Sequence, residues 1–258
     1  MILKKQRVRL TGSTYTRFIT ILVLLALTTA LSGESPYKKV IYSAFITHDM
    51  AKWEKEIGIM EATNSINSVD QKLELIDYYY GYIGWLIGQK KYKQAEKMIP
   101  RAEALINQVI KVSQKNATAY SYKGSFLGFK VGIDKYKSIF LGPESKKDIN
   151  KALALDPQNI QANIDKGNLL FYEPCLFGGD KKEALNYFLK GVKLMEMNKE
   201  TNENWAYLNL LTIIADAYEK TDRLEEAKLT YEKIIRIEPE IKWVINDLYP
   251  SLLAKIKS

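Results

Sequence analysis

The spacing of apolar residues constrains this chain more than any other feature of its sequence. From about residue 45 onward they recur every three or four positions, and strict alternation of apolar and polar residues is almost absent. Short clusters of helix-breaking residues separate these stretches, at Gly142-Pro143, Asp156-Pro157, Gly178-Gly179-Asp180, Thr221-Asp222 and Glu238-Pro239. The pattern predicts an all-α protein of antiparallel helix pairs with short connections.

Two segments resemble each other closely enough to indicate a duplicated helical unit. Residues 116–127 align with residues 159–170, and they share Asn, Ala, Lys, Gly and Leu at equivalent places. The shared glycines are Gly124 and Gly167. Because glycine has no side chain, we expect both to lie where the facing helix approaches closely.

The last unit has the clearest register of large apolar, small and aromatic positions. Its members are Leu211, Ile214, Ala215, Tyr218, Leu224, Ala227, Tyr231, Ile234 and Pro239. This register resembles the tetratricopeptide repeat (TPR) family, whose unit is a helix pair of about 34 residues. The resemblance covers roughly residues 70–240 and implies a right-handed superhelical solenoid of about four TPR-like helix pairs.

The resemblance also divides the chain. Residues 69–239 hold the repeats, residues 33–68 form an N-terminal extension with a capping helix, and residues 240–258 form C-terminal capping helices. We expect capping helices because the terminal repeats of a solenoid otherwise expose an apolar face.

The first 32 residues have the order of a secretory signal. Five cations and no acid precede residue 33, and residues 18–31 form an apolar run that ends in small residues. The run is shorter than the roughly 20 residues that a membrane-spanning helix needs. We therefore expect cleavage after Ser32 and an exported, most simply periplasmic, protein. A retained N-terminal membrane anchor is the alternative.

Two repeats depart from the family's pattern because their internal connections are elongated. The extra segments, residues 130–142 and 173–179, are rich in aromatic and aliphatic residues, and we expect them to fold back onto the helices. Residues 177–185 also resemble the Gly-Gly-Asp entry of the TPR-like T-component of TRAP transport systems. That resemblance implies a ligand cleft walled by Phe140, Tyr172 and Phe177. Alternatively, Asp180 is simply the N-cap of the next helix.

The composition argues against most enzyme chemistry and against nucleic-acid binding. With one Cys and one His, the chain has little from which to build a zinc site or a nucleophile–His pair, so we expect no catalytic residues, metal or other cofactor. Five of the eight net positive charges lie before residue 33. The remaining lysines are interspersed with glutamates, so no basic stripe is formed for a phosphate backbone.

In TPR stacks, the first helices of the pairs line the concave surface, so its exposed positions follow from the register. The predicted groove consists of Asp77, Tyr80, Ser121, Ser125, Asn168, Phe171, Asn209 and Asp216. It is polar, slightly acidic and aromatic, and it lacks the Lys/Arg pairs that clamp a peptide's terminal carboxylate. The neighbouring Tyr79, Tyr82, Ile83 and Leu86 share one helical face and are predicted to be core.

These observations favour a non-enzymatic, exported TPR-like scaffold that binds a protein segment or assists an envelope complex. The alternative is a periplasmic small-ligand carrier subunit associated with a transport system, with its ligand between the two elongated connections. The sequence does not indicate an oligomeric state.

Overall fold

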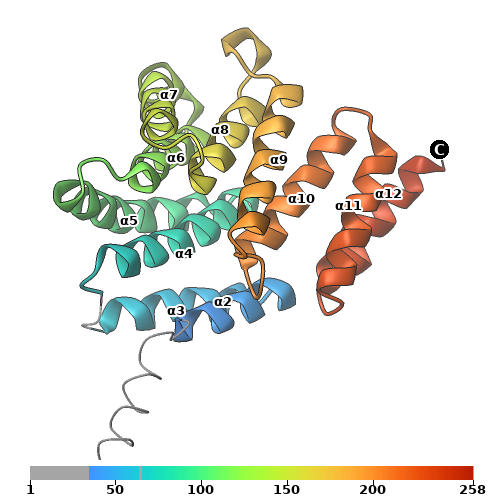
Figure 1. Ribbon diagram of the computed structural model, residues 1–258, viewed down its shortest axis with the longest axis horizontal. Helices are drawn as coiled ribbons and strands as arrows, with labels where there is room; N and C mark the ends of the chain where they lie inside the picture. Colours follow the sequence, from blue (N-terminus) through green and yellow to red (C-terminus); the bar gives the residue numbers. More distant parts are fainter. Residues whose placement is uncertain (1–34, 64–65, 258) are drawn as a thin grey trace, which may run out of the picture. The chain divides into compact units, whose positions relative to one another are not determined.

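The computed structural model describes residues 35–63 and 66–257, and these residues form helices and connections only (Figure 1). The all-α prediction is therefore confirmed. The chain divides into two compact units, residues 1–38 and 39–258, and the description below concerns the second. The predicted secretory segment, residues 1–32, lies outside the described residues.

Four helix pairs follow one another along the chain, as the repeat register predicts. In each pair the two helices pack against each other. The pairs are α4 (Val69–Gly88) with α5 (Tyr92–Val112), α6 (Ala117–Ile133) with α7 (Ser138–Leu155), α8 (Ile160–Tyr172) with α9 (Lys181–Met197), and α10 (Trp205–Glu219) with α11 (Leu224–Ile237).

The pairs are flanked by shorter elements. On the N-terminal side lie α2 (Pro36–Thr47) and α3 (Met50–Ala62), and on the C-terminal side lie the π-helical segment η3 (Val244–Leu248) and α12 (Tyr249–Ile256). Two short 3-10 helices, η1 (Lys135–Lys137) and η2 (Cys175–Phe177), lie in the elongated connections.

Polar side chains fix where the first helices of the pairs begin. At α4, Ser68 accepts a hydrogen bond from the backbone of Gln71 at 3.1 Å, and the Gln71 side chain accepts one from the backbone of Ser68 at 3.0 Å. Asn116, Asn159 and Asn204 cap α6, α8 and α10 through their side-chain oxygens. These side chains satisfy backbone N–H groups that have no partner within the helix.

The glycines of the duplicated unit allow two helices to meet, as predicted. A Cβ atom on Gly124 would lie 2.6 Å from Ile149 Cγ1 and 2.8 Å from the carbonyl oxygen of Ser145. A Cβ atom on Gly167 would overlap the Phe188 ring. Both pairs therefore pack more closely than any larger residue permits.

The elongated connections differ from the prediction in two ways. Helix α6 continues to Ile133 and α7 begins at Ser138, so Gly142 and Pro143 lie inside α7 rather than in a connection. Proline has no backbone N–H, so Pro143 leaves the carbonyl of Ile139 without its hydrogen bond within the helix. Because Ile139 is exposed, water can bind that carbonyl instead. The second difference concerns packing: Tyr136, Phe140 and Leu176 are 91%, 76% and 89% exposed, so the connections do not fold back onto the helices.

Aromatic residues join α2 and α3 to the C-terminal part of the chain. The Phe45 ring contacts the rings of Trp53, Trp205 and Trp243, with centroids 5.5 to 6.4 Å apart. Trp243 Nε1 donates a hydrogen bond to the carbonyl of Phe45 at 3.1 Å, and the Tyr42 hydroxyl donates to Glu238 at 2.6 Å. Helix α2 therefore lies against both α10 and the C-terminal elements.

Candidate functional site

The first helices bring several predicted groove residues together, but around buried carboxylates. Asp77 on α4 accepts hydrogen bonds from the Tyr122 hydroxyl of α6 at 2.9 Å and from Trp205 Nε1 of α10 at 2.8 Å. Burial raises the pKa of Asp77 to about 6, although both hydrogen bonds act in the opposite direction. Three helices that are far apart in sequence are thus joined at one carboxylate.

A second carboxylate, Asp165 on α8, is almost completely buried. It accepts hydrogen bonds from the Ser121 hydroxyl at 2.5 Å, the Tyr80 hydroxyl at 2.8 Å and Gln161 Nε2 at 3.0 Å. Asn168 Nδ2 in turn donates to the Tyr80 oxygen at 2.8 Å. Burial raises the pKa of Asp165 to about 6, and the hydrogen bonds to it, including one from Ser125, lower it.

This network changes the picture of the predicted groove. Ser121 is fully buried and Phe171 is 4% exposed, so neither reaches the surface as expected from the register. Phe171 instead packs against Phe188, with ring centroids 6.1 Å apart. The predicted groove did not include Asp165. The sequence contained a signal for it, because Asp165 lies on the same helical face as Gln161 and Asn168.

Trp205 closes the concave side near α4. A Cβ atom on Gly81 would lie 2.6 Å from the Trp205 ring, so the indole lies directly on the α4 backbone. The space that remains is a cavity of about 20 Å³, lined by Asp77, Tyr80, Gln161, Ile164, Trp205, Ala206, Asn209, Leu210 and Ile213. A cavity of that size has room for about one water molecule. It is too small for a peptide or a cofactor.

An open groove lies further along, between α10, α11 and α12. Its volume is about 340 Å³, within the range of small binding sites. We call it the C-terminal groove, and its lining residues are Thr212, Ile213, Asp216, Glu219, Tyr231, Leu248, Ser251 and Lys255. Asp216 is the one member of the predicted groove that lines it.

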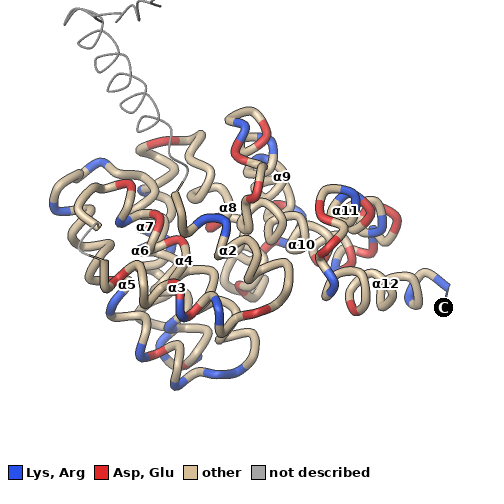
Figure 2. The backbone as a smooth tube through the Cα atoms, turned by 90° about the horizontal axis from the view of Figure 1, so that it is seen from below, with Lys and Arg blue, Asp and Glu red and all other residues tan. Residues whose placement is uncertain are grey.

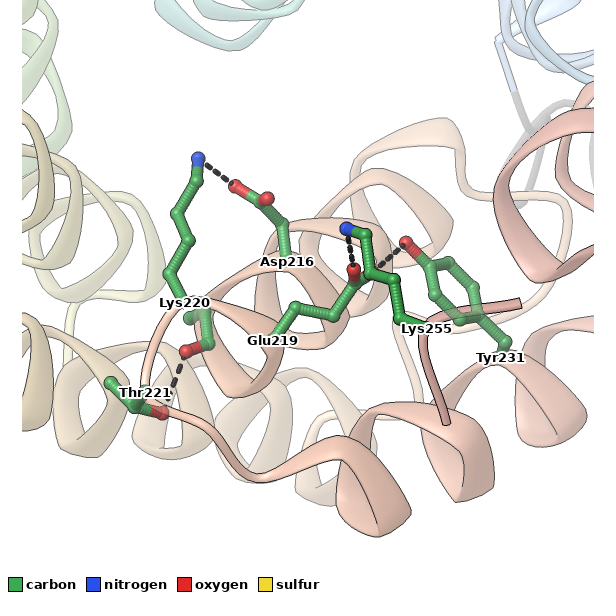
Figure 3. Close-up of polar contacts among 7 residues, drawn as sticks. Asp216, Glu219, Lys220, Thr221, Tyr231 and Lys255 are labelled. Carbon is green, nitrogen blue, oxygen red and sulfur yellow. Dashed lines mark hydrogen bonds and ion pairs between the residues drawn. The ribbon is translucent and has the colours of Figure 1, made fainter. Parts of the chain in front are cut away.

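Charged pairs form the polar wall of the C-terminal groove (Figure 3). Lys255 Nζ contacts Glu219 Oε2 at 2.7 Å, and the Tyr231 hydroxyl donates to the other Glu219 oxygen at 3.3 Å. Lys220 Nζ contacts Asp216 Oδ2 at 2.6 Å. Burial and the neighbouring carboxylate of Glu219 raise the pKa of the Tyr231 phenol, so it remains a hydrogen-bond donor.

The groove therefore offers both donors and acceptors beside an apolar part formed by Ile213 and Leu248. The exposed Lys220–Asp216 pair can exchange partners at little cost, because such a pair contributes only about 0–1 kcal/mol. Such a wall can bind backbone amides and charged side chains of an incoming segment.

The residues predicted to wall a small-ligand cleft line neither of these two spaces. Phe140, Tyr172 and Phe177 are all exposed. Neither the 20 Å³ cavity nor the C-terminal groove includes any of them. The ring of Tyr172 instead meets the ring of Phe171 edge-on, with centroids 5.0 Å apart.

Metal clusters and membrane spans are both absent from the described part of the chain. No group of three or more His, Cys, Asp or Glu residues there could hold a metal ion. Within residues 35–63 and 66–257, no helix is long and apolar enough to cross a bilayer. Lysine and arginine are interspersed with aspartate and glutamate along the backbone (Figure 2).

Comparison with known proteins agrees with the fold. Residues 208–241 match the tetratricopeptide repeat family, the unit whose register was clearest in the sequence. Among curated proteins, no sequence relative matches.

Two solved structures share the fold at low sequence identity. The HusA haemophore from Porphyromonas gingivalis has a TM-score of 0.55 and 15% identity, covering 74% of this chain and 97% of that one. A thermophilic TPR protein from Thermus thermophilus has a TM-score of 0.52 and 12% identity, covering 80% of this chain and 93% of that one.

Proposed function

We propose that this chain is a non-enzymatic, TPR-like scaffold that binds a segment of a partner protein in the C-terminal groove. TPR-like helical repeats imply a protein-interaction scaffold. The observation that supports this location is the open, 340 Å³ space between α10 and α12, where ion pairs lie beside apolar side chains. Near α4, the contact of Trp205 with the helix leaves a cavity of only about 20 Å³.

We further propose that the scaffold acts outside the cytoplasm, with partners in the cell envelope. The support is the sequence of residues 1–32, in which five cations precede an apolar run and small residues. A cleaved signal gives a soluble periplasmic scaffold, whereas a retained segment gives one anchored in the membrane. Intact mass of the protein from soluble and membrane fractions separates the two.

Site-specific crosslinking tests the groove. A photoreactive amino acid replaces Ser251, an exposed residue that lines the groove, and the partner is sought by mass spectrometry after irradiation of intact cells. The control places the same amino acid at Leu229, which is exposed on α11 but does not line the groove. We expect adducts from position 251 only. Equal adducts from both positions, or none from position 251, would contradict the proposal.

The small-ligand carrier is the second candidate, and one observation favours it: Phe140, Tyr172 and Phe177 expose aromatic rings on the two elongated connections. Since a structure of the same fold is described as a haemophore, haem is the first probe for this candidate. A saturable one-to-one change in the haem absorption band, lost in a Phe140→Ser/Phe177→Ser variant, would support a carrier. Adducts at position 251 together with no haem binding would support the scaffold and exclude the haem carrier.

A further inference from the structure

Five large apolar side chains are exposed in or beside the α6–α7 and α8–α9 connections. Tyr136, Ile139 and Phe140 come from η1 and the start of α7, and Leu176 and Phe177 come from η2. Each is between 65% and 91% exposed. We call these five residues the apolar tip patch. Single exposed apolar residues are ordinary on protein surfaces, but a group of this size marks an interaction site.

Lys146 on α7 attaches the second connection to the first. Its ammonium group donates a hydrogen bond to the carbonyl of Phe177 at 2.7 Å and contacts Glu173 Oε1, also at 2.7 Å. Gly178, with φ 103°, allows the chain to turn back toward α9. Ile139 and Phe140 lie about two helical turns before Lys146 on the same α7, so both halves of the patch lie at one edge of the repeats.

The charges around the patch have a small positive excess. Asp134 pairs with Lys137, and Glu173 pairs with Lys146. Four exposed lysines flank these segments without an ion pair to any described residue: Lys135, Lys147, Lys181 and Lys182. Glu144, Asp180 and Glu183 are the acids that remain, so the four lysines outnumber them by one.

We propose that the apolar tip patch docks onto the surface of an anionic lipid bilayer. Tyrosine favours the headgroup region, phenylalanine and leucine enter the acyl boundary, and lysines attract anionic lipids. The exposures distinguish this partner from a protein. Side chains that are about 90% exposed, such as Tyr136 and Leu176, project almost free of neighbours. A fluid bilayer can surround projecting side chains, whereas a protein partner needs pockets that match them.

We expect this docking to be reversible. Only a few side chains enter the outer part of the bilayer, so the buried apolar area is small. It works in addition to the C-terminal groove, which lies on other helices and shares no residue with the patch. If residues 18–31 are retained as an anchor, the patch supplies a second attachment and orients the repeats on the membrane.

The single cysteine of the chain makes this contact measurable. Cys175 is exposed in η2, next to Leu176, and it can carry an environment-sensitive fluorophore in the full-length protein without any substitution. The label is titrated with vesicles of phosphatidylcholine alone and with vesicles that contain about a third phosphatidylglycerol. We expect a blue shift and increased emission with the anionic vesicles, and much weaker changes with neutral ones.

Two variants test the two parts of the surface. Ile139→Ser/Phe140→Ser removes apolar side chains from the other connection. We expect the apparent affinity for anionic vesicles, measured by the label on Cys175, to fall about tenfold. Lys181→Glu/Lys182→Glu should abolish the preference for anionic vesicles. The matched control, Cys175→Ser/Leu229→Cys, carries the label at an exposed apolar position on α11 and should not respond.

The outcomes are decisive because the label reports its own surroundings, even when the N-terminal segment binds vesicles. No response at Cys175, or an equal response at position 229, would overturn the proposal. A response that depends on protein concentration without vesicles would instead identify a second copy of the chain as the partner. An equal response with neutral and anionic vesicles would contradict the proposed attraction between the lysines and anionic lipids.

Discussion

The indole of Trp205 and the carboxylate of Asp77 form a 2.8 Å hydrogen bond although they lie in the first and last helix pairs. The bond places the start of α10 against α4, where Gly81 makes room for the ring. It explains why the concave side is not an open groove along its whole length. The part beyond Trp205, between α10 and α12, stays accessible.

We expect Trp205→Phe to lower the free energy of unfolding by about 2–4 kcal/mol. The variant loses ring contacts and leaves a buried carboxylate with one donor fewer. Trp85→Phe is the matched control, because the buried Trp85 Nε1 has no hydrogen-bond partner in the described structure. That control should cost no more than about 1 kcal/mol. Urea unfolding of both variants measures the difference, and equal losses would show that the Asp77 bond contributes nothing.

The two buried carboxylates predict an unusual dependence of stability on pH. Burial raises the pKa of Asp77 and of Asp165 from 3.8 to about 6. The folded protein therefore holds these protons at a pH where the unfolded chain has released them. The stabilisation from both groups is complete below about pH 4 and is lost as the pH rises through about 6.

Melting temperatures between about pH 4.5 and 8 test this prediction when they are compared with Asp77→Asn/Asp165→Asn. The variant mimics the protonated carboxyls and has nothing to titrate at these positions. Relative to it, the wild type should become less stable as the pH rises. The comparison subtracts groups that act in the opposite direction, such as Glu196, whose pKa is lowered by its hydrogen bond to Lys233. A constant difference across the range would contradict the prediction.

The close contact at Gly124 predicts that even one methyl group is harmful there. Gly124→Ala forces apart Ile149 and the backbone of Ser145, and we expect a loss of about 1–3 kcal/mol. Gly58→Ala on α3 is the opposite case, because an added Cβ meets nothing within 4 Å. It should stabilise the protein by about 0.5–1 kcal/mol, since alanine restricts the unfolded chain and favours helix. Thermal melting of the two variants should therefore shift in opposite directions.

Some features of this fold are readable in the sequence because they depend on local pattern. The register of the last repeat and the glycines at 124 and 167 repeat at fixed spacing, and both were predicted correctly. Tyr79, Tyr82, Ile83 and Leu86 share one helical face and are buried as expected. Asp165 could also have been predicted, from its place between Gln161 and Asn168.

Other features depend on contacts between distant parts of the chain. Trp205 follows a long connection, and nothing near it in sequence indicates that its indole meets Asp77. The same holds for Phe45 and Trp243, whose rings meet only after the whole repeat array has formed. The aromatic residues of the elongated connections predicted that these segments fold back onto the helices, and this was wrong. Composition alone does not distinguish a loop that packs on its own protein from one that meets a partner.

The contacts of Lys146 predict that one side chain orders the connection between α8 and α9. Lys146→Met removes the ion pair with Glu173 and the hydrogen bond to the carbonyl of Phe177, while keeping most of the aliphatic stem. This partly buried ion pair contributes about 1 kcal/mol, so we expect roughly fivefold faster chymotrypsin cleavage after Leu176 or Phe177 and little change in melting temperature. Lys147→Met, which removes an exposed neighbour without an ion pair to a described residue, is the control. If both variants were cleaved at the wild-type rate, another contact would hold the connection in place, and the two halves of the apolar tip patch would not depend on Lys146.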